Sequence, residues 1–267
     1  MERPPTYSLR LVLQAVLLLA LGSVQAAAPA PAPSPVRIAA AADLKFALEE
    51  VASAFRKAQP GCNLSITYGS SGNFYAQIRS GAPFDLFLSA DVEYARRLSE
   101  EGLTLGPPFV YAIGRLALCV PSTSGLSLGK TGLAVLRSPD VRKIAIANPR
   151  HAPYGRAAEE ALRRSGLLDA LRDRLVLGEN VAQAAQFVEA GSADAALVAL
   201  SLAVSAPMRS ATRCEAVPAD LHAPLTQGGV ILKGAADQKA AAALRDLLLG
   251  AEGRAILARF GFSSTEP

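Results

Sequence analysis

Cysteine is scarce in this sequence, and its spacing argues against two classes of protein. Three cysteines occur among the 267 residues, with no Cys-X-X-Cys pair: Cys62, Cys119 and Cys214. An odd and widely spaced set is typical neither of a disulfide-stapled domain nor of a structural zinc site. At most one disulfide can form, and the spacing does not indicate which. We expect instead three partly buried thiols that pack as small apolar groups.

Other chemical groupings are also missing. The two histidines, His151 and His222, have neither a second histidine nor a carboxylate partner within a motif, so a metal site has no support. The one Gly-X-Ser-X-Gly stretch, Gly125–Gly129, lies in a Ser/Gly-rich segment rather than in a strand-to-helix elbow, so a nucleophilic serine has no support. The net charge of +4 comes from scattered arginines rather than from basic runs alternating with aromatics. We therefore expect no cofactor, no nucleic-acid binding and no enzymatic activity.

Long apolar runs are absent except at the N-terminus. Arg3 and Arg10 precede the run "LVLQAVLLLALGSV", and the small residues "VQAAA" follow it. This order predicts a cleaved secretory signal peptide over 1–28, with an uncleaved anchor as the alternative. The Ala/Pro-rich segment 29–35 is expected to be an extended linker. The mature protein is thus predicted to be periplasmic, without stable insertion in the membrane.

From Val36 onward, short apolar runs alternate with segments of helical period. The run 36–42 is typical of a strand. The segment 43–59 has apolar residues on one helical face and Asp43 at the expected N-cap position. Repetition of this pattern predicts an α/β protein with largely parallel sheets. We expect two lobes, formed by residues 36–115 with 222–267 and by residues 116–221, and a ligand cleft between them.

Four turns share one pattern, in which an apolar run leads directly into a helix. They are Ala39–Leu44, Tyr68–Asn73, Asn148–Arg156 and Gly178–Gln183. The first N–H groups of a helix lack an intrahelical acceptor, and the helix dipole adds partial positive charge there. An anion satisfies both conditions. An ordinary serine N-cap is the alternative for the second turn alone, but four such turns favour an anion site.

Neutral donors are strong enough for such a site. A hydrogen bond to a charged partner contributes about 1.5–3 kcal/mol. About six of them could supply the ~10–12 kcal/mol of a nanomolar complex after the losses of association. Binding of an anion therefore requires no arginine or lysine in these turns.

Several stretches, taken in order, resemble one known family. The most specific is "SGAPFDLFLSAD", Ser80–Asp91; the others are "AAADLKFAL", "YGSSGNFYAQI", "ANPRHAPYGRAAEEAL", "GENVAQAAQFVEAGSADAALV" and "LARFGF". Together they resemble the periplasmic molybdate-binding proteins of ABC transporters. The resemblance implies a periplasmic binding protein-like II fold, in which two lobes, each a mostly parallel sheet flanked by helices, close over a tetrahedral dianion.

The resemblance also implies a set of ligand-binding residues. The serine of the second turn falls on Ser71, with Ser70 beside it. The main-chain N–H groups of Tyr154 and Val181 are implied for the third and fourth turns. The first turn would contribute Ala42 or Asp43. These residues bind the oxyanion, and none of them binds a metal ion directly.

Two positions depart from the family pattern. Asp43 stands where a hydroxyl or amide is expected, and a carboxylate about 4 Å from an anion costs about 4 kcal/mol at an effective dielectric constant near 20. We expect Asp43 to point away as an N-cap; the alternatives are a protonated carboxyl or a less charged ligand. Ala199 replaces a tyrosine found in many relatives. Two hydroxyl donors are thereby lost.

The sequence thus favours a monomeric solute-binding protein that captures molybdate or tungstate and delivers it to an ABC permease. A binding protein for another oxyanion or a small carboxylate is the alternative, given Asp43 and Ala199. An enzyme on the same fold would have only Asp43 with His151 as a candidate pair. Two further carboxylates have structural interpretations: Asp85 as a partner of a basic side chain or of local N–H groups, and Asp91 as a helix cap.

Overall fold

The computed structural model describes residues 1–2, 35–129 and 132–264. By its contacts the chain divides into residues 1–32 and residues 33–267, and the second unit contains all the described helices and strands. Apart from Met1, Glu2 and Pro35, the predicted signal peptide 1–28 and linker 29–35 lie outside the described residues. Within the described part, none of the helices combines the length and the apolar character that crossing a membrane requires.

The first sheet, sheet 1, is built from both ends of the folded chain. Its strand order is β2 (Leu64–Gly69), β1 (Val36–Ala41), β3 (Leu86–Ser89), β10 (Leu225–Ile231) and β4 (Phe109–Gly114). β1 pairs in parallel with β2 and β3, and β10 is antiparallel to both of its neighbours. Four of the five strands therefore point the same way. β10 is the element through which the chain returns to this sheet.

The second sheet, sheet 2, repeats this arrangement with the intervening chain. Its order is β7 (Leu175–Gly178), β6 (Ile144–Ala147), β8 (Ala195–Ala199), β5 (Leu116–Pro121) and β9 (Thr212–Ala216). β6 is parallel to β7 and β8, whereas β5 is antiparallel to β8 and β9. β5 is almost fully buried and is the first strand of sheet 2 along the chain.

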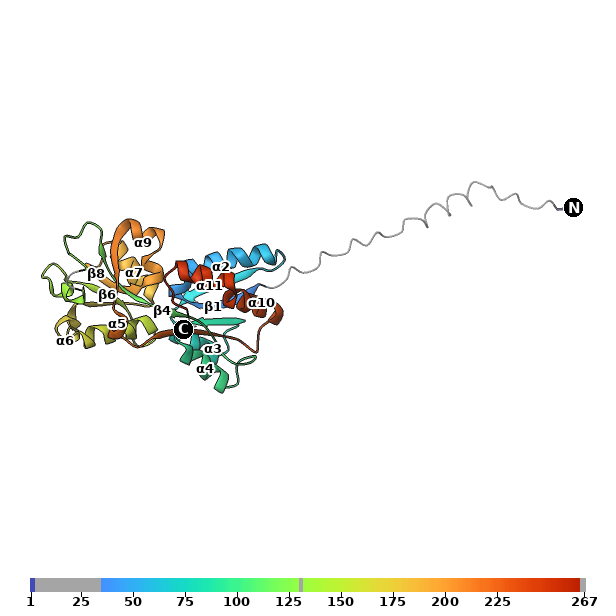
Figure 1. Ribbon diagram of the computed structural model, residues 1–267. Helices are drawn as coiled ribbons and strands as arrows, with labels where there is room; N and C mark the ends of the chain where they lie inside the picture. The colour runs from blue at the N-terminus through green and yellow to red at the C-terminus, as the bar shows by residue number, and fades with distance from the viewer. Residues whose placement is uncertain (3–34, 130–131, 265–267) are drawn as a thin grey trace. The chain divides into compact units, whose positions relative to one another are not determined.

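Helices cover both faces of sheet 1 because its strands are apolar on both sides (Figure 1). One face packs against α2 (Lys45–Ala58), α10 (Gln238–Leu249) and α11 (Ala251–Arg259), through strand residues such as Ile38 and Leu88. The other face packs against α3 (Ser71–Arg79) and α4 (Val92–Glu100), through residues such as Phe87. The apolar face predicted for residues 43–59 is buried as expected.

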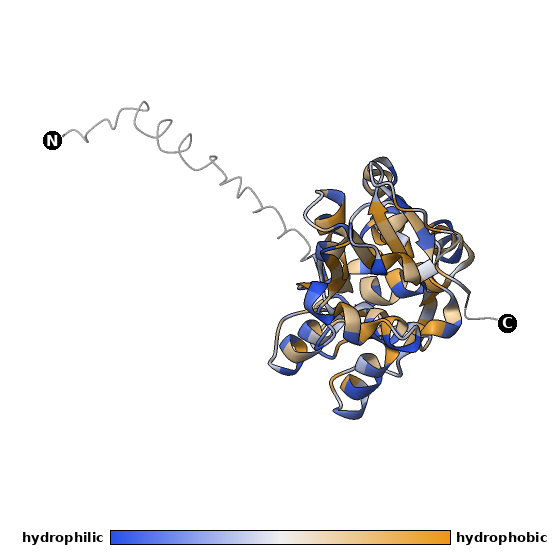
Figure 2. Cartoon of the chain, turned by 90° about the vertical axis from the view of Figure 1, so that its left-hand side faces the viewer, coloured by the Kyte–Doolittle hydropathy of each residue, from blue (hydrophilic) through white to orange (hydrophobic). Residues whose placement is uncertain are grey.

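Sheet 2 is likewise covered on both faces (Figure 1). Its helices are α5 (Pro153–Arg164), α6 (Leu168–Leu171), α7 (Val181–Glu189), α8 (Leu200–Ala203) and α9 (Ala206–Ala211). Short 3-10 turns are η1 (Ala42–Leu44), η2 (Gly132–Arg137), η3 (Arg172–Arg174) and η4 (Ala219–Leu221). Colouring by hydropathy shows the strands as largely hydrophobic and the helices as mixed along their length, as expected for a layered α/β protein (Figure 2).

Two carboxylates have the structural roles that the sequence predicts. Asp85 is buried and forms an ion pair with the Arg37 guanidinium at 3.0 Å, and it also accepts from the main-chain N–H groups of Arg37 and Ala236. Asp91 caps α4, because its side chain accepts from the N–H of Glu93. The lobe boundaries predicted at residues 115 and 221 stay a prediction, although the strands divide between the two sheets in the same order.

The expectation of three thiols is wrong for two of the cysteines. Cys119 on β5 and Cys214 on β9 face each other in register and form a disulfide, whereas Cys62 is free and half-buried. The pairing joins residues 95 positions apart. Sequence spacing carried no sign of it, because the two strands become neighbours only through the order of sheet 2.

We expect the disulfide to stabilise the folded protein substantially. Closing a loop of this length removes chain entropy from the unfolded state, and loss of such a bond typically lowers the free energy of unfolding by about 2–5 kcal/mol. The double variant Cys119→Ala/Cys214→Ala should show this loss in denaturant unfolding. Cys62→Ala is the control, with a change below about 1 kcal/mol. Equal stabilities of the double variant and the wild type would contradict the assignment.

Candidate functional site

The four turns singled out from the sequence meet around one small cavity. Its lining comes from the ends of strands and the starts of helices in both halves of the unit, and it includes all six predicted ligand residues: Ala42, Asp43, Ser70, Ser71, Tyr154 and Val181. The cavity encloses about 190 Å³ of space that no atom fills, part of it open to solvent. The space within the lining is therefore small.

Main-chain donors are available at each helix start. α5 begins at Pro153, which has no N–H, and the N–H groups of Gly155 and Arg156 both donate to the carbonyl of Ala152. The N–H of Tyr154 is therefore the first donor of that helix without an intrahelical acceptor. In α7 the Asn180 side chain accepts from the second and third N–H groups of the helix. The first N–H group, that of Val181, therefore also lacks an intrahelical acceptor.

The two neighbouring serines have different surroundings. Ser71 Oγ accepts a hydrogen bond from the N–H of Ala90 at 3.0 Å, which leaves its own proton to donate. Ser70 Oγ instead lies 2.8 Å from His151 Nδ1. Ser71 is thus the serine equipped to donate to a bound oxyanion, and Ser70 joins the turn after β2 to the turn before α5.

His151 has a more specific environment than its sequence context indicates. Its Nε2 lies 3.7 Å from Glu179 Oε1, and that carboxylate accepts from Asn73 Nδ2 at 2.6 Å. The carbonyl of His151 accepts from the N–H of Gly72 at 2.9 Å. The sequence motif around His151 contains no carboxylate, and the fold brings Glu179 to it from another turn. The histidine links elements packed on sheet 1 to loops of sheet 2.

Further contacts join the two halves beside the cavity. Arg156 of α5 forms an ion pair with Asp91 at 2.6 Å and donates to the Tyr94 hydroxyl at 3.1 Å. On another side, Ser201 of α8 donates to the main-chain oxygen of Asp43 at 2.7 Å. Arg156, at the end of the third turn, is therefore paired with Asp91. The cavity lining itself contains no lysine or arginine.

Asp43 does not act as an N-cap, so that expectation is wrong. The start of the 3-10 turn explains the difference. η1 already begins at Ala42, so Ala41 holds the N-cap position, and α2 follows without a side-chain cap. Asp43 therefore lies within the turn and is only 1% exposed. Its Oδ2 accepts a hydrogen bond from Gln227 Nε2, and its Oδ1 has no hydrogen-bond partner among the described residues.

Gln227 connects Asp43 to two buried tyrosines. Gln227 Oε1 lies 2.9 Å from the Tyr111 hydroxyl, which also lies 2.9 Å from the carbonyl of Ser89. Gln227 Nε2 lies 3.3 Å from the Tyr154 hydroxyl. A Cβ atom at Gly114 would lie too close to both the Tyr154 hydroxyl and the Gln227 amide, so a larger residue there would displace these groups. This network was not predicted from the sequence.

The electrostatic setting of Asp43 follows from its burial. Loss of solvation raises the pKa of Asp43 to about 6, although the Gln227 amide, the nearby Tyr154 hydroxyl and the main-chain N–H groups of Asp43 and Leu44 act in the opposite direction. Burial and the nearby Asp43 also raise the pKa values of Tyr111 and Tyr154 well above the usual value, so both hydroxyls are neutral at physiological pH. No ion pair to Asp43 occurs among the residues that the structure describes.

Ala199, the other departure from the family pattern, is buried at the end of β8 and is not part of the cavity lining. His222 is buried as well, with Nδ1 2.7 Å from the carbonyl of Ala223. Over the described ranges, no group of three or more His, Cys, Asp or Glu side chains is arranged to hold a metal ion.

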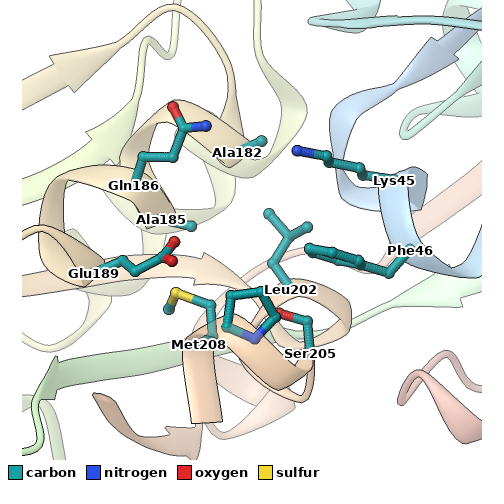
Figure 3. A pocket seen from close by; sticks show the side chains of 10 residues that line it. Lys45, Phe46, Ala182, Ala185, Gln186, Glu189, Leu202, Ser205 and Met208 are labelled. Atoms are coloured by element: carbon teal, nitrogen blue, oxygen red, sulfur yellow. The ribbon is translucent and has the colours of Figure 1, made fainter. Parts of the chain in front are cut away.

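A larger groove lies farther along the same helices α2 and α7. Figure 3 shows Lys45 and Phe46 on one side and Gln186, Glu189 and Met208 on the other. The groove contains about 600 Å³ of unfilled space, including open solvent, over a largely apolar floor. One ammonium and one carboxylate group at its edges do not form a set of converging donors, so this groove is not the anion site.

Comparisons with known proteins agree with this geometry. The model of a family described as bacterial extracellular solute-binding protein matches residues 36–263. The molybdate-binding protein ModA of Azotobacter vinelandii is 38% identical over 227 residues, 85% of this chain and 88% of that protein. ModA of Rhodobacter capsulatus is 36% identical over 225 residues, 84% and 86% of the two chains. The predicted resemblance is thereby confirmed.

A solved structure supports the fold class directly. The periplasmic molybdate-binding protein of Azotobacter vinelandii superposes with a TM-score of 0.80 at 34% identity, covering 86% of this chain and 100% of that one. The predicted two-lobed fold, with each sheet flanked by helices, is confirmed.

The raised pKa of Asp43 predicts a specific pH dependence of stability. Its favourable contribution is complete below the ordinary value of 3.8 and is lost as the pH rises through about 6. In denaturant unfolding, the free energy of unfolding of Asp43→Asn relative to that of the wild type should therefore rise by up to about 3 kcal/mol from about pH 4 to pH 8. Asp140→Asn, which removes an exposed carboxylate, is the control. A constant difference between Asp43→Asn and the wild type would contradict the prediction.

Proposed function

Because this chain belongs to the family of bacterial extracellular solute-binding proteins, we propose that its cavity binds a tetrahedral oxyanion, molybdate or tungstate. One observation carries the proposal. Four strand-to-helix turns, two from each half, line a single cavity whose lining has no lysine or arginine. Main-chain N–H groups and the Ser71 hydroxyl are the donors that such an arrangement offers.

Neutral donors suit a dianion that must later be released. A hydrogen bond to a charged acceptor contributes about 1.5–3 kcal/mol, so about six such bonds stabilise a tight complex without a counter-charge. Sulfate, molybdate and tungstate present the same charge, shape and acceptor atoms. Selection among them therefore depends on cavity size. The fold fixes the positions of the helix starts, and these positions set the size of the cavity.

Delivery to a transporter follows from the two-part architecture. Helix starts of sheet 1 provide Ala42, Asp43 and Ser71, and those of sheet 2 provide Tyr154 and Val181. An ion held by both sets draws the two halves together. We propose that the exported, monomeric protein presents this closed form to an ABC permease, after export to the periplasm directed by residues 1–28.

The contacts at the cavity do not favour an enzyme on this fold. Asp43 is bonded to Gln227 and Ser201, whereas His151 is bonded to Ser70 and approaches Glu179. No hydrogen bond or ion pair joins Asp43 to His151 in the described part of the chain. The one acid–base pair that the sequence offered is therefore not assembled, and the family is one of solute-binding proteins.

The direct test is calorimetric titration with molybdate, tungstate, sulfate and phosphate. We expect heat with molybdate and tungstate and little with the other two. Ser71→Ala removes one donor to a charged acceptor and should weaken molybdate binding about 10- to 100-fold.

Ser65→Ala, an exposed serine on the same strand β2, is the matched control and should bind as the wild type does. Native mass spectrometry of the purified protein should detect a retained oxyanion. Heat from none of the four anions would reject the proposed ligand, and an unaffected Ser71→Ala variant would reject the proposed role of that serine.

A further inference from the structure

We propose that Asp43 binds the oxyanion as a neutral carboxylic acid, so that each bound dianion is accompanied by the uptake of one proton. The inference rests on the proposed function and concerns the chemistry of the same cavity. It assigns a donor role to the side chain of Asp43, at a position where the family resemblance implies a side-chain donor.

The two carboxyl oxygens of Asp43 differ in their partners. Oδ2 accepts from Gln227 Nε2, and Oδ1 is buried without a hydrogen bond to any described residue. A buried oxygen without a partner is costly in a closed protein interior. Asp43 lines the cavity, so a ligand placed there is the group that this oxygen can meet.

The orientation of Gln227 decides which oxygen carries the proton. In the structure Gln227 Nε2 donates to Asp43 Oδ2, and Gln227 Oε1 lies 2.9 Å from the Tyr111 hydroxyl, whose one proton is shared with the Ser89 carbonyl at the same distance. Oδ2 therefore remains an acceptor. A proton on Oδ1 completes the hydrogen bonding of the carboxyl group and gives it an O–H donor, in place of a negative charge that would repel the ligand.

The described elements packed around Asp43 supply no charged group that would balance a negative charge on its carboxyl group. β4 and α5 contribute the hydroxyls of Tyr111 and Tyr154, and β10 contributes the amide of Gln227. α8 contributes Ser201, which bonds the main chain of Asp43 rather than its carboxyl group. Among the described ion pairs none includes Asp43. The raised pKa of Asp43, about 6, supports the same conclusion, because burial already favours the protonated form.

The magnitude of the repulsion makes protonation decisive. An ionised carboxylate at contact distance from an anion would weaken binding about a thousandfold. Linkage requires the ligand to raise the proton affinity of Asp43 by the same factor. At a pH one or two units above 6, Asp43 is mostly ionised in the free protein and mostly protonated in the complex. The proton is therefore taken up from solvent on binding.

The test is titration of the full mature chain with molybdate at about pH 7.5 in buffers that differ in ionisation enthalpy. The dependence of the observed heat on buffer enthalpy counts the protons exchanged. We expect about one proton taken up per ion. The affinity should also fall about tenfold for each pH unit between about 7 and 8.5.

Asp43→Asn keeps an uncharged donor of similar shape and removes the titrating group. This variant should take up no proton and should bind molybdate with little dependence on pH. Asp140→Asn, at an exposed position, should retain the proton uptake of the wild type. Infrared spectroscopy offers a second readout, because molybdate should produce the C=O band of a protonated carboxyl group in the wild type and not in Asp43→Asn.

The outcomes separate this inference from the proposed function. Molybdate binding by the wild type without proton uptake, and with flat affinity across the pH range, would overturn the inference and leave the oxyanion function intact. Proton uptake that persists in Asp43→Asn would show that a group other than Asp43 takes up the proton, and this result would also overturn the inference. Absence of binding with every oxyanion would reject both. The wild-type measurement decides the question even if Asp43→Asn does not fold.

Discussion

The structure depends on one constraint: helix-start N–H groups that have no acceptor within their helices converge on a single space. Strand register produces this convergence. In sheet 1 the last residues of β1 and β2, Ala41 and Gly69, are paired neighbours, and in sheet 2 Ala147 and Gly178 hold the same relation. Parallel strands end at the same edge, so the turns that follow them are adjacent. Two such edges then face one cavity.

The sequence was sufficient for this part of the site because its signals are local. A strand, a turn of small residues and the first turn of a helix occupy about a dozen consecutive positions, and the start of each helix identifies its unpaired donors. These local signals identified the turns, and the family resemblance assigned Ser71, Tyr154 and Val181 within them. All three line one cavity, and their role in ligand binding stays a prediction. Each of them needs only its main-chain position or one hydroxyl group to act.

The parts that the sequence did not reveal depend on distant pairings. Gln227 lies 184 positions from Asp43 and 116 from Tyr111, and the strand that carries it enters sheet 1 only after the chain has built sheet 2. Cys119 and Cys214 meet across strands for the same reason. The prediction of Asp43 as an N-cap was wrong for a local reason, since η1 begins two residues earlier than that pattern assumes. A buried glutamine within an apolar strand was the one available signal.

The buried network also ties the charge of Asp43 to the contact between the halves. Gln227 Nε2, on a strand of sheet 1, faces both the Asp43 carboxyl group and the hydroxyl of Tyr154, which belongs to a helix of sheet 2. An ionised Asp43 repels the ligand, whereas a neutral one keeps its hydrogen bond from Gln227 and adds a donor at the cavity. Because the same residues close the two halves and set the local charge, ligand binding, closure and protonation of Asp43 are linked in one free-energy cycle.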